Sequence, residues 1–197
     1  MVTHVIALDP SGNFNEGKGT TGWVLLQLPD KLIASGTIKA TKYKCQEDFW
    51  NAHVELLKQT INKYKKNLMV VIEDYILYKS RTENQINSQF ETCRLIGLLQ
   101  WYCWKHHQKV LLETASQVKQ RWSDYVLCER GYLYEAGNRY YHAHTKQLIE
   151  NHTRDALRHA LHYSYCKHNK PNKPKRKQKI ERYSNYGHTK RNAGRRS

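Results

Sequence analysis

The first forty residues alternate between short apolar runs and polar breaks, a pattern typical of strands rather than helices. Residues 3–8 are nearly all apolar and stop at Asp9 and Pro10, because proline has no N–H to give to a strand ladder. After a polar loop, residues 20–28 and 31–38 again have the composition of strands. We therefore expect an antiparallel meander that leaves the Asp9 carboxylate at a strand end, a favourable place for a divalent cation.

A helix and a fully apolar strand follow the meander. Residues 46–67 repeat apolar side chains at a helical period and carry lysines on the opposite face. Residues 68–72 form a continuous apolar run, typical of a strand covered on both faces, and the run ends at Glu73. A strand reached through a helix is normally parallel to its partner. If this strand lies beside the first, Asp9 and Glu73 emerge at the same edge, within reach of one ion.

The remaining pattern predicts three more elements and one irregular segment. Residues 82–107 form the longest predicted helix, whose second half is apolar nearly all round. That helix is either a central core helix or one that packs partly on a second copy of the protein. Residues 109–113 predict a short strand, the aromatic-rich segment 125–141 a hairpin or ordered loop, and residues from about 145 to 167 a final helix.

The final predicted helix carries a stripe of titratable side chains. His152, Asp155, His159 and His162 are spaced by three, four and three residues, so they share one helix face beside small and apolar residues. An acid in such surroundings is costly to bury unless it is paired or bound to a cation. A lone histidine would more often be a hydrogen-bonded structural residue. Next to Asp155, and opposite two strand-end carboxylates, His152 is predicted to be a metal ligand.

Composition sets the domain organisation and the type of partner. A chain of 197 residues fits one α/β domain, which we place at 1–166. The formal net charge of +16 favours a polyanionic partner, most often nucleic acid. Residues 167–197 hold 12 Lys and Arg against one acid, so we expect a disordered basic tail. That tail is either a phosphate-binding arm or simply a tolerated terminus.

Other sequence features bear on the cellular location of the protein, on the state of its cysteines and on two nucleotide-binding alternatives. The absence of an apolar run of about 18 residues and of a signal-peptide pattern predicts a cytosolic protein without a membrane segment. Five cysteines without CxxC spacing favour reduced thiols over disulfides or zinc.

Residues 12–20 match a phosphate-loop pattern, but that loop requires a following helix and a strand is predicted here. A sugar-kinase or actin type of ATPase would need a second lobe that the chain is too short to supply.

Together, the motifs resemble those of RuvC-type Holliday junction resolvases. The motifs lie in the same order along residues 2–166: Ile6 to Gly12, Thr20 to Trp23, Val71 to Glu73, Gln117 to Lys119, and His152 to Leu157. The resemblance implies an RNase H-like fold, a mixed five-stranded sheet flanked by helices. It also implies a metal-dependent endonuclease that resolves four-way DNA junctions by paired symmetric nicks, leaving 5′-phosphate and 3′-hydroxyl ends.

The resemblance assigns roles to particular residues. Asp9, Glu73, His152 and Asp155 would form the catalytic metal-binding set, and Lys119 would lie near the scissile phosphate. The ions expected are two Mg²⁺ about 4 Å apart and bridged by Asp9, with Mn²⁺ also accepted because of His152. Paired cuts on a nearly two-fold substrate imply a homodimer. The candidate interface is the Trp101 to Trp104 end of the long helix.

The sequence also departs from the bacterial resolvases. The loop 13–19 is longer, segment 123–145 does not align, and the basic tail is extra, which suggests a phage-type member with looser substrate choice. Tyr75 or Tyr78 would replace the family's aromatic wedge, and Lys146 is the candidate for its second lysine. The remaining predicted DNA contacts are in the tail: Lys175, Arg176 and Lys177. A less selective nuclease of flaps, forks or packaging intermediates, and a non-catalytic nucleic-acid-binding protein, are the alternative functions.

Overall fold

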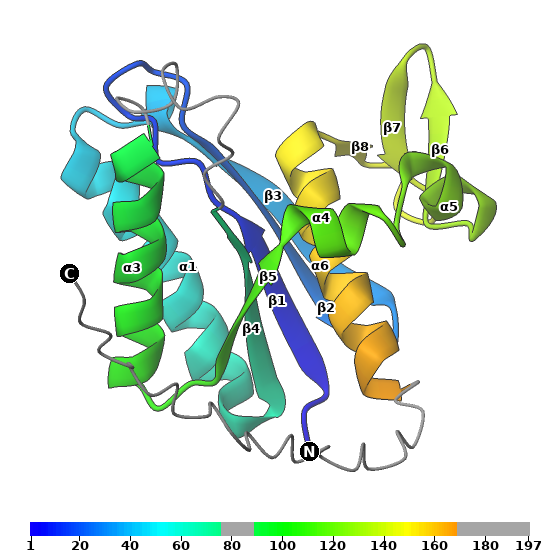
Figure 1. Cartoon of the computed structure of the whole chain (residues 1–197), viewed down its shortest axis with the longest axis horizontal. Helices are drawn as coiled ribbons and strands as arrows, with labels where there is room; N and C mark the ends of the chain where they lie inside the picture. Colours follow the sequence, from blue (N-terminus) through cyan, green and yellow to red (C-terminus); the bar gives the residue numbers. More distant parts are fainter. Residues whose placement is uncertain (76–88, 169–197) are drawn as a thin grey trace, which may run out of the picture.

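A computed structural model of the chain describes residues 1–75 and 89–168, and one five-stranded sheet organises them (Figure 1). The elements are β1 (His4–Asp9), β2 (Thr20–Gln27), β3 (Lys31–Lys39), a short 3-10 turn (Ala40–Lys42), α1 (Gln46–Tyr64), a second 3-10 turn (Lys65–Asn67), β4 (Leu68–Asp74), α3 (Gln89–Lys105), β5 (Val110–Thr114), α4 (Ala115–Lys119), α5 (Asp124–Glu129), β6 (Leu133–Ala136), β7 (Arg139–His142), β8 (Leu148–Ile149) and α6 (Asn151–His168).

The sheet has the strand order β3-β2-β1-β4-β5. β1, β2 and β3 pair antiparallel, which confirms the predicted meander. β4 pairs parallel with β1, and β5 pairs parallel with β4. Helix α1 makes the crossover from β3 to β4. This confirms the prediction made from the helical pattern and the apolar run that follows it.

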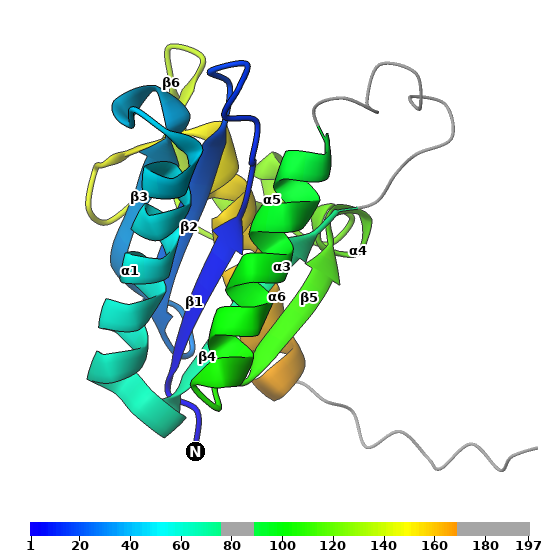
Figure 2. The same cartoon turned by 90° about the vertical axis from the view of Figure 1, so that its left-hand side faces the viewer.

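Helices cover both faces of the sheet. α1 and α3 lie on one face and α6 on the other, with the central strands between them (Figure 2). Because side chains alternate along a strand, Ile6 and Leu8 pack in the core cluster on the α1 and α3 side. Val5 and Ala7 pack in the opposite cluster together with residues of α6. β1 is therefore buried on both faces, which explains its continuous apolar sequence.

The same alternation directs three acids toward α6. Asp9 is two residues beyond Ala7, and Glu73 is two residues beyond Val71, which lies in the α6-side cluster. Leu8 pairs with Ile72, so Asp9 and Glu73 follow at the same level of neighbouring strands. Glu73 in turn pairs with Glu113 of β5. Strand direction and side-chain period together collect carboxylates at one edge, on one face.

Helix α6 crosses the sheet in direct contact with β2. A Cβ atom built on Gly22 would lie 2.0 Å from the carbonyl carbon of His152 and 2.1 Å from the amide nitrogen of Thr153. Gly22 pairs with Asp9 across the β1–β2 ladder. Only a residue without a side chain lets the first turn of α6 approach the strand end so closely.

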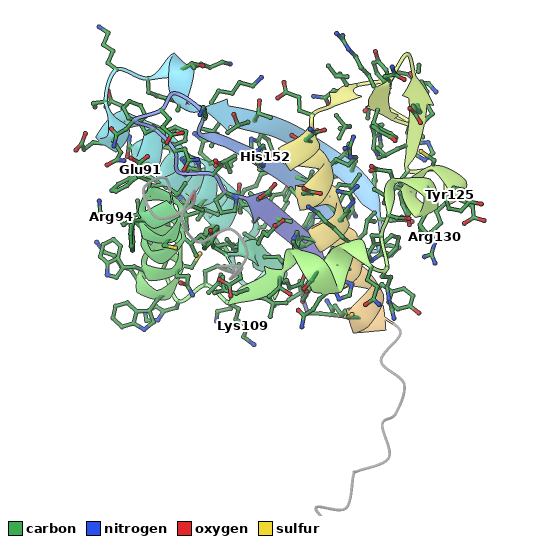
Figure 3. The ribbon with its side chains drawn as sticks, turned by 45° about the horizontal axis from the view of Figure 1, so that its top comes forward. Glu91, Arg94, Lys109, Tyr125, Arg130 and His152 are labelled. Atoms are coloured by element: carbon green, nitrogen blue, oxygen red, sulfur yellow. The ribbon has the colours of Figure 1, made fainter. Side chains whose placement is uncertain are left out.

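The loop between β1 and β2 is held by the start of α3. The carboxylate of Glu91 accepts the backbone N–H of Phe14 at 2.6 Å, and the Thr92 hydroxyl accepts that of Gly12 at 2.9 Å. These amides are therefore already paired, and Thr20 begins a strand rather than a helix. Both observations agree with rejecting the phosphate-loop interpretation of this segment. Figure 3 shows Glu91 on α3 next to this loop.

A small second sheet is attached beside α6. β6, β7 and β8 form an antiparallel sheet, with α5 preceding it (Figure 1). The prediction for 125–141 was correct for the hairpin and missed α5. The predicted start of the last helix near residue 145 was wrong, because Leu148 and Ile149 pair with β7 and α6 begins at Asn151. Lys146, at φ 58°, lies in the turn between β7 and β8.

Several predictions concern segments outside the described residues. These are the start of the 82–107 helix up to residue 88, the wedge candidate Tyr78, and the basic tail beyond residue 168 with Lys175, Arg176 and Lys177. In the described part of the chain, no helix has the length and apolarity needed to cross a membrane.

The contact at Gly22 gives a stability prediction. Gly22→Ala inserts a methyl group into the backbone of α6, so we expect a loss of about 1–3 kcal/mol in the free energy of unfolding. Urea denaturation followed by circular dichroism measures it. The matched control is Gly97→Ala on α3, where a Cβ meets nothing within 4 Å and the change should be neutral or stabilising. Equal effects of the two substitutions would contradict the close packing of α6 on β2.

Candidate active site

Three carboxylates converge at the carboxyl edge of the sheet. One oxygen from each of Asp9, Glu73 and Asp155 lies within 4.8 Å of the others, with Asp9 buried and the other two half-buried. Asp9 comes from β1, Glu73 from β4 and Asp155 from α6, so residues up to 146 positions apart in sequence form one cluster. Oxygen ligands at this spacing suit hard divalent cations such as Mg²⁺ and Mn²⁺. The chemistry of the donor set thus fits the ions implied by the sequence motifs.

His152 lies next to this cluster and is paired with its most buried member. Its Nδ1 is 2.7 Å from Oδ2 of Asp9, and Figure 3 shows the residue at the start of α6. Burial raises the pKa of Asp9 to about 6, although the hydrogen bond with His152 opposes this shift. The same hydrogen bond raises the pKa of His152. His152 therefore reaches the site as predicted, and its role as a metal ligand remains a prediction.

His159, two turns further along α6, is held between two acids. Its Nε2 lies 2.9 Å from Glu73 and its Nδ1 lies 3.1 Å from Glu113. Burial by itself would lower the pKa of His159, but the bonds to Glu113 and Glu73 outweigh burial and raise it to about 9. The His159 ring therefore holds the Glu73 carboxylate in place. His162, which was predicted on the same helix face, lies 3.5 Å from the Cys166 sulfur.

Sequence reasoning missed Glu113 as a member of this constellation. Glu113 lies near the end of β5 as Glu73 lies near the end of β4, and the two residues pair directly in the sheet. The signal was present in the sequence, since a third apolar run also ended in an acid. A single buried histidine between two carboxylates offsets the repulsion that would otherwise separate the strand ends.

Two cations hold Asp155. Lys119 Nζ lies 2.9 Å from its Oδ2, and Arg158 pairs with its Oδ1. Burial opposes the positive charge of Lys119, but Asp155 outweighs burial and raises the Lys119 pKa. Arg158 is fixed in turn by Asp124 and by the carbonyl of Trp122, which its Nε reaches at 2.8 Å. Lys119 was predicted for this site, whereas Arg158 was missed, although its spacing of three residues from Asp155 along one helix is visible in the sequence.

Two of the other predicted DNA contacts, Tyr75 and Lys146, are among the described residues. Tyr75 packs against the core cluster on the α1 and α3 side of the sheet. Lys146 lies on the β7–β8 turn with its ammonium 4.7 Å from the centroid of the Tyr134 ring. Neither is part of the carboxylate cluster.

Comparison with known proteins identifies the fold. No protein-family model and no curated protein matches the sequence. Among solved structures, T. thermophilus RuvC in complex with a Holliday junction substrate is similar, with a TM-score of 0.61 and 15% identity over 85% of this chain and 96% of that one. A second Thermus thermophilus RuvC structure gives a TM-score of 0.59 at 15% identity, over 84% of this chain and 96% of that one. The described domain therefore has the RNase H-like fold of RuvC, as the sequence motifs predicted.

The carboxylate cluster gives a metal-binding prediction. Saturating Mg²⁺ or Mn²⁺ should raise the thermal unfolding midpoint by about 5–10 °C, because an ion that binds the folded state stabilises it. Asp9→Asn should lose most of this shift. Without metal it should be at least as stable as the wild type, because it removes a buried acid whose pKa burial raises. Differential scanning calorimetry with and without EDTA measures both effects.

The matched control for this prediction is Asp48→Asn, which changes an exposed acid of α1. This control should keep the full metal-induced shift. If Asp9→Asn kept it as well, the ions would bind elsewhere and the cluster would not be the metal site.

Proposed function

We propose that this protein is a metal-dependent, structure-selective DNA endonuclease that resolves four-way junctions by paired symmetric nicks. The observation that carries the proposal is the meeting of Asp9, Glu73 and Asp155 at one sheet edge of a RuvC fold. One of the two similar RuvC structures is a complex with a Holliday junction substrate, which supports the choice of a branched DNA. A pure binding protein would gain nothing from carboxylates that repel the phosphate backbone, so the cluster favours catalysis over the non-catalytic alternative.

The proposed cofactor is a pair of Mg²⁺ ions, replaceable by Mn²⁺. Asp9, Glu73 and Asp155 would hold the ions, with His152 completing the ligand set if its pair with Asp9 opens. When bound, such ions supply an activated water as the nucleophile and stabilise the leaving 3′ oxygen, which leaves 5′-phosphate and 3′-hydroxyl ends.

The neighbouring cations would support this chemistry from fixed positions. His159 and Arg158 both project from α6. His159 holds the carboxylate of Glu73 and Arg158 holds that of Asp155, which would keep the oxygens oriented before any ion binds. The exposed side chain of Lys119 pairs with Asp155 at 2.9 Å and can turn toward a non-bridging phosphate oxygen when an ion takes over that carboxylate. A lysine so placed would stabilise the charge that develops on the phosphate.

The charge distribution supports nucleic acid as the substrate. The formal net charge is +16, and the basic residues beyond 167 include the predicted contacts Lys175, Arg176 and Lys177. Tyr75, Tyr78 and Lys146 remain further candidates for contacts with the branch point. We also propose that the protein acts in the cytosol, of a bacterial host if the phage-type prediction is correct.

The exposed face of α3 supports a homodimer. Phe90, Trp101 and Trp104 recur at helical spacing on this face, and they are 62%, 51% and 74% exposed. Large aromatic side chains exposed along one helix favour an interface with another protein surface. A second copy would provide the second active site that paired cutting of a two-fold substrate requires.

A less selective nuclease of flaps, forks or packaging intermediates is the second candidate function. The feature that favours it is the β6–β7 hairpin of the second sheet, which lies in segment 123–145, predicted from the motifs to differ from the bacterial resolvases. The substrate range therefore has to be measured together with the activity.

The first test of the proposed function is cleavage of a labelled four-way junction with Mg²⁺, Mn²⁺ or EDTA, beside matched duplex, flap and single strand. We expect symmetric metal-dependent nicks at the junction, and a loss of about 10³-fold or more in rate for Asp9→Asn. Asp48→Asn, on the exposed face of α1, is the control. Equal cutting of all branched substrates would favour the less selective nuclease, and binding without cutting under either metal would refute an enzyme.

The second test concerns the oligomeric state. Trp104→Glu introduces a charge into the exposed aromatic face of α3, so sedimentation velocity should change from dimer to monomer. The matched control is Tyr125→Glu on α5, another aromatic residue that is 73% exposed and should not affect dimerisation. A dimer that survives Trp104→Glu would exclude this face as the interface.

A further inference from the structure

A groove with a mixed polar and apolar lining opens beside the carboxylate cluster. It offers a volume of about 520 Å³ and lies between the start of β2, the β6–β8 sheet and the first turn of α6. Its walls are formed by Thr20, Asn138, Arg139, Tyr140, Leu148, Ile149, Glu150, Asn151, His152 and Arg154. His152 belongs both to this groove and to the pair with Asp9, so the groove and the proposed cutting site are continuous.

Arg154 is fixed in this groove before any ligand arrives. Its Nε lies 2.8 Å from Asp124, one of its terminal nitrogens donates to Asn151 at 3.1 Å, and its guanidinium lies 4.3 Å from the Tyr140 ring centroid. The side chain is only 14% exposed. A guanidinium held on three sides loses little conformational entropy when it binds an anion, and its flat fork suits a phosphate.

The groove has a second arginine and little uncompensated negative charge. Arg139, the exposed first residue of β7, lies on the wall formed by the second sheet. The one acid in the lining, Glu150, is paired with Lys39 at 2.8 Å. Two guanidinium groups, one of them already paired with Asp124, and the side-chain amides of Asn138 and Asn151 offer donors to phosphate and sugar oxygens, while Tyr140 and Leu148 add apolar surface.

We propose that this groove binds the backbone of the DNA strand that continues from the phosphate being cut, with Arg154 and Arg139 contacting its phosphates. This inference rests on the proposed nuclease function and adds to it the path of the DNA strand beside the cut phosphate. Because β6 and β7 lie in segment 123–145, which is predicted to differ from the bacterial resolvases, the groove would also give this chain its own substrate preference. The groove is open and continuous with the active edge, which suits a passing strand better than an enclosed small molecule.

The test uses Arg139, because its exposed side chain can be changed without disturbing the contacts of Arg154. A fluorescent four-way junction is titrated with the full chain, with Ca²⁺ in place of Mg²⁺ to slow cutting, and anisotropy is recorded at several salt concentrations. Arg139→Glu should weaken binding about 10-fold or more and reduce the salt slope by about one, as expected for one lost phosphate contact. Arg139→Lys should recover most of the affinity.

The matched control is Lys66→Glu, which makes the same change of charge on an exposed residue before β4, at the opposite end of the sheet. Both variants lower the net charge by two, so a general electrostatic effect would weaken binding equally in both. Equal losses would overturn the groove as a specific binding site.

A modified substrate locates the contact. Single phosphates on each side of the branch point are replaced by neutral methylphosphonates, and each junction is measured with wild type and Arg139→Glu. We expect one flanking position where the replacement weakens binding by the wild type about 10-fold and has little effect on the variant. Additive effects at every position would refute the contact.

The outcomes separate this inference from the proposed function. If the wild type binds junctions but never cuts them, the nuclease proposal fails while the methylphosphonate pattern still tests the groove. If the wild type cuts and Arg139→Glu matches Lys66→Glu at every position, the groove inference fails alone. A wild type that binds no DNA overturns both.

Discussion

Repulsion between carboxylates at the sheet edge is the constraint on which the site depends. Asp9, Glu73, Glu113 and Asp155 are brought together from four elements, and like charges in partly buried positions are costly unless they are paired. The chain offsets this repulsion with basic side chains that lie between the acids, and each of them contacts one or two acids. His159 is the clearest case, since it joins the ends of β4 and β5. One oxygen from each of Asp9, Glu73 and Asp155 thereby lies within 4.8 Å of the others.

Close packing of α6 makes this arrangement possible. The first turn of the helix approaches β2 where Gly22 offers no side chain, and Gly22 is the ladder partner of Asp9. The same approach sets the 2.7 Å contact between His152 and Asp9. On the other face, Glu91 at the start of α3 holds the loop that follows Asp9. α3 and α6 therefore both contact the segments that position the Asp9 carboxylate.

The second sheet lines a groove next to this edge. Residues of β7 and β8 form one wall of the groove, and Arg154 of α6 forms another. Asp124 helps to fix both Arg154 and Arg158, so one acid links the groove to the carboxylate cluster through α5.

The sequence by itself determined the strands of the main sheet and the parallel step to β4, because strand period is local and a crossover through a helix is normally parallel. The meeting of Asp9 with Glu73 was predicted only on the condition that β4 lies beside β1, and the tertiary structure decided that pairing. The helical stripe also predicted that Asp155 and His152 would face them. Only the tertiary structure decided that His152 pairs with Asp9 and His159 with Glu73 and Glu113, since those distances depend on how closely α6 packs at Gly22. It also decided where α6 begins, because pairing of β8 with β7 overrides the local helical pattern.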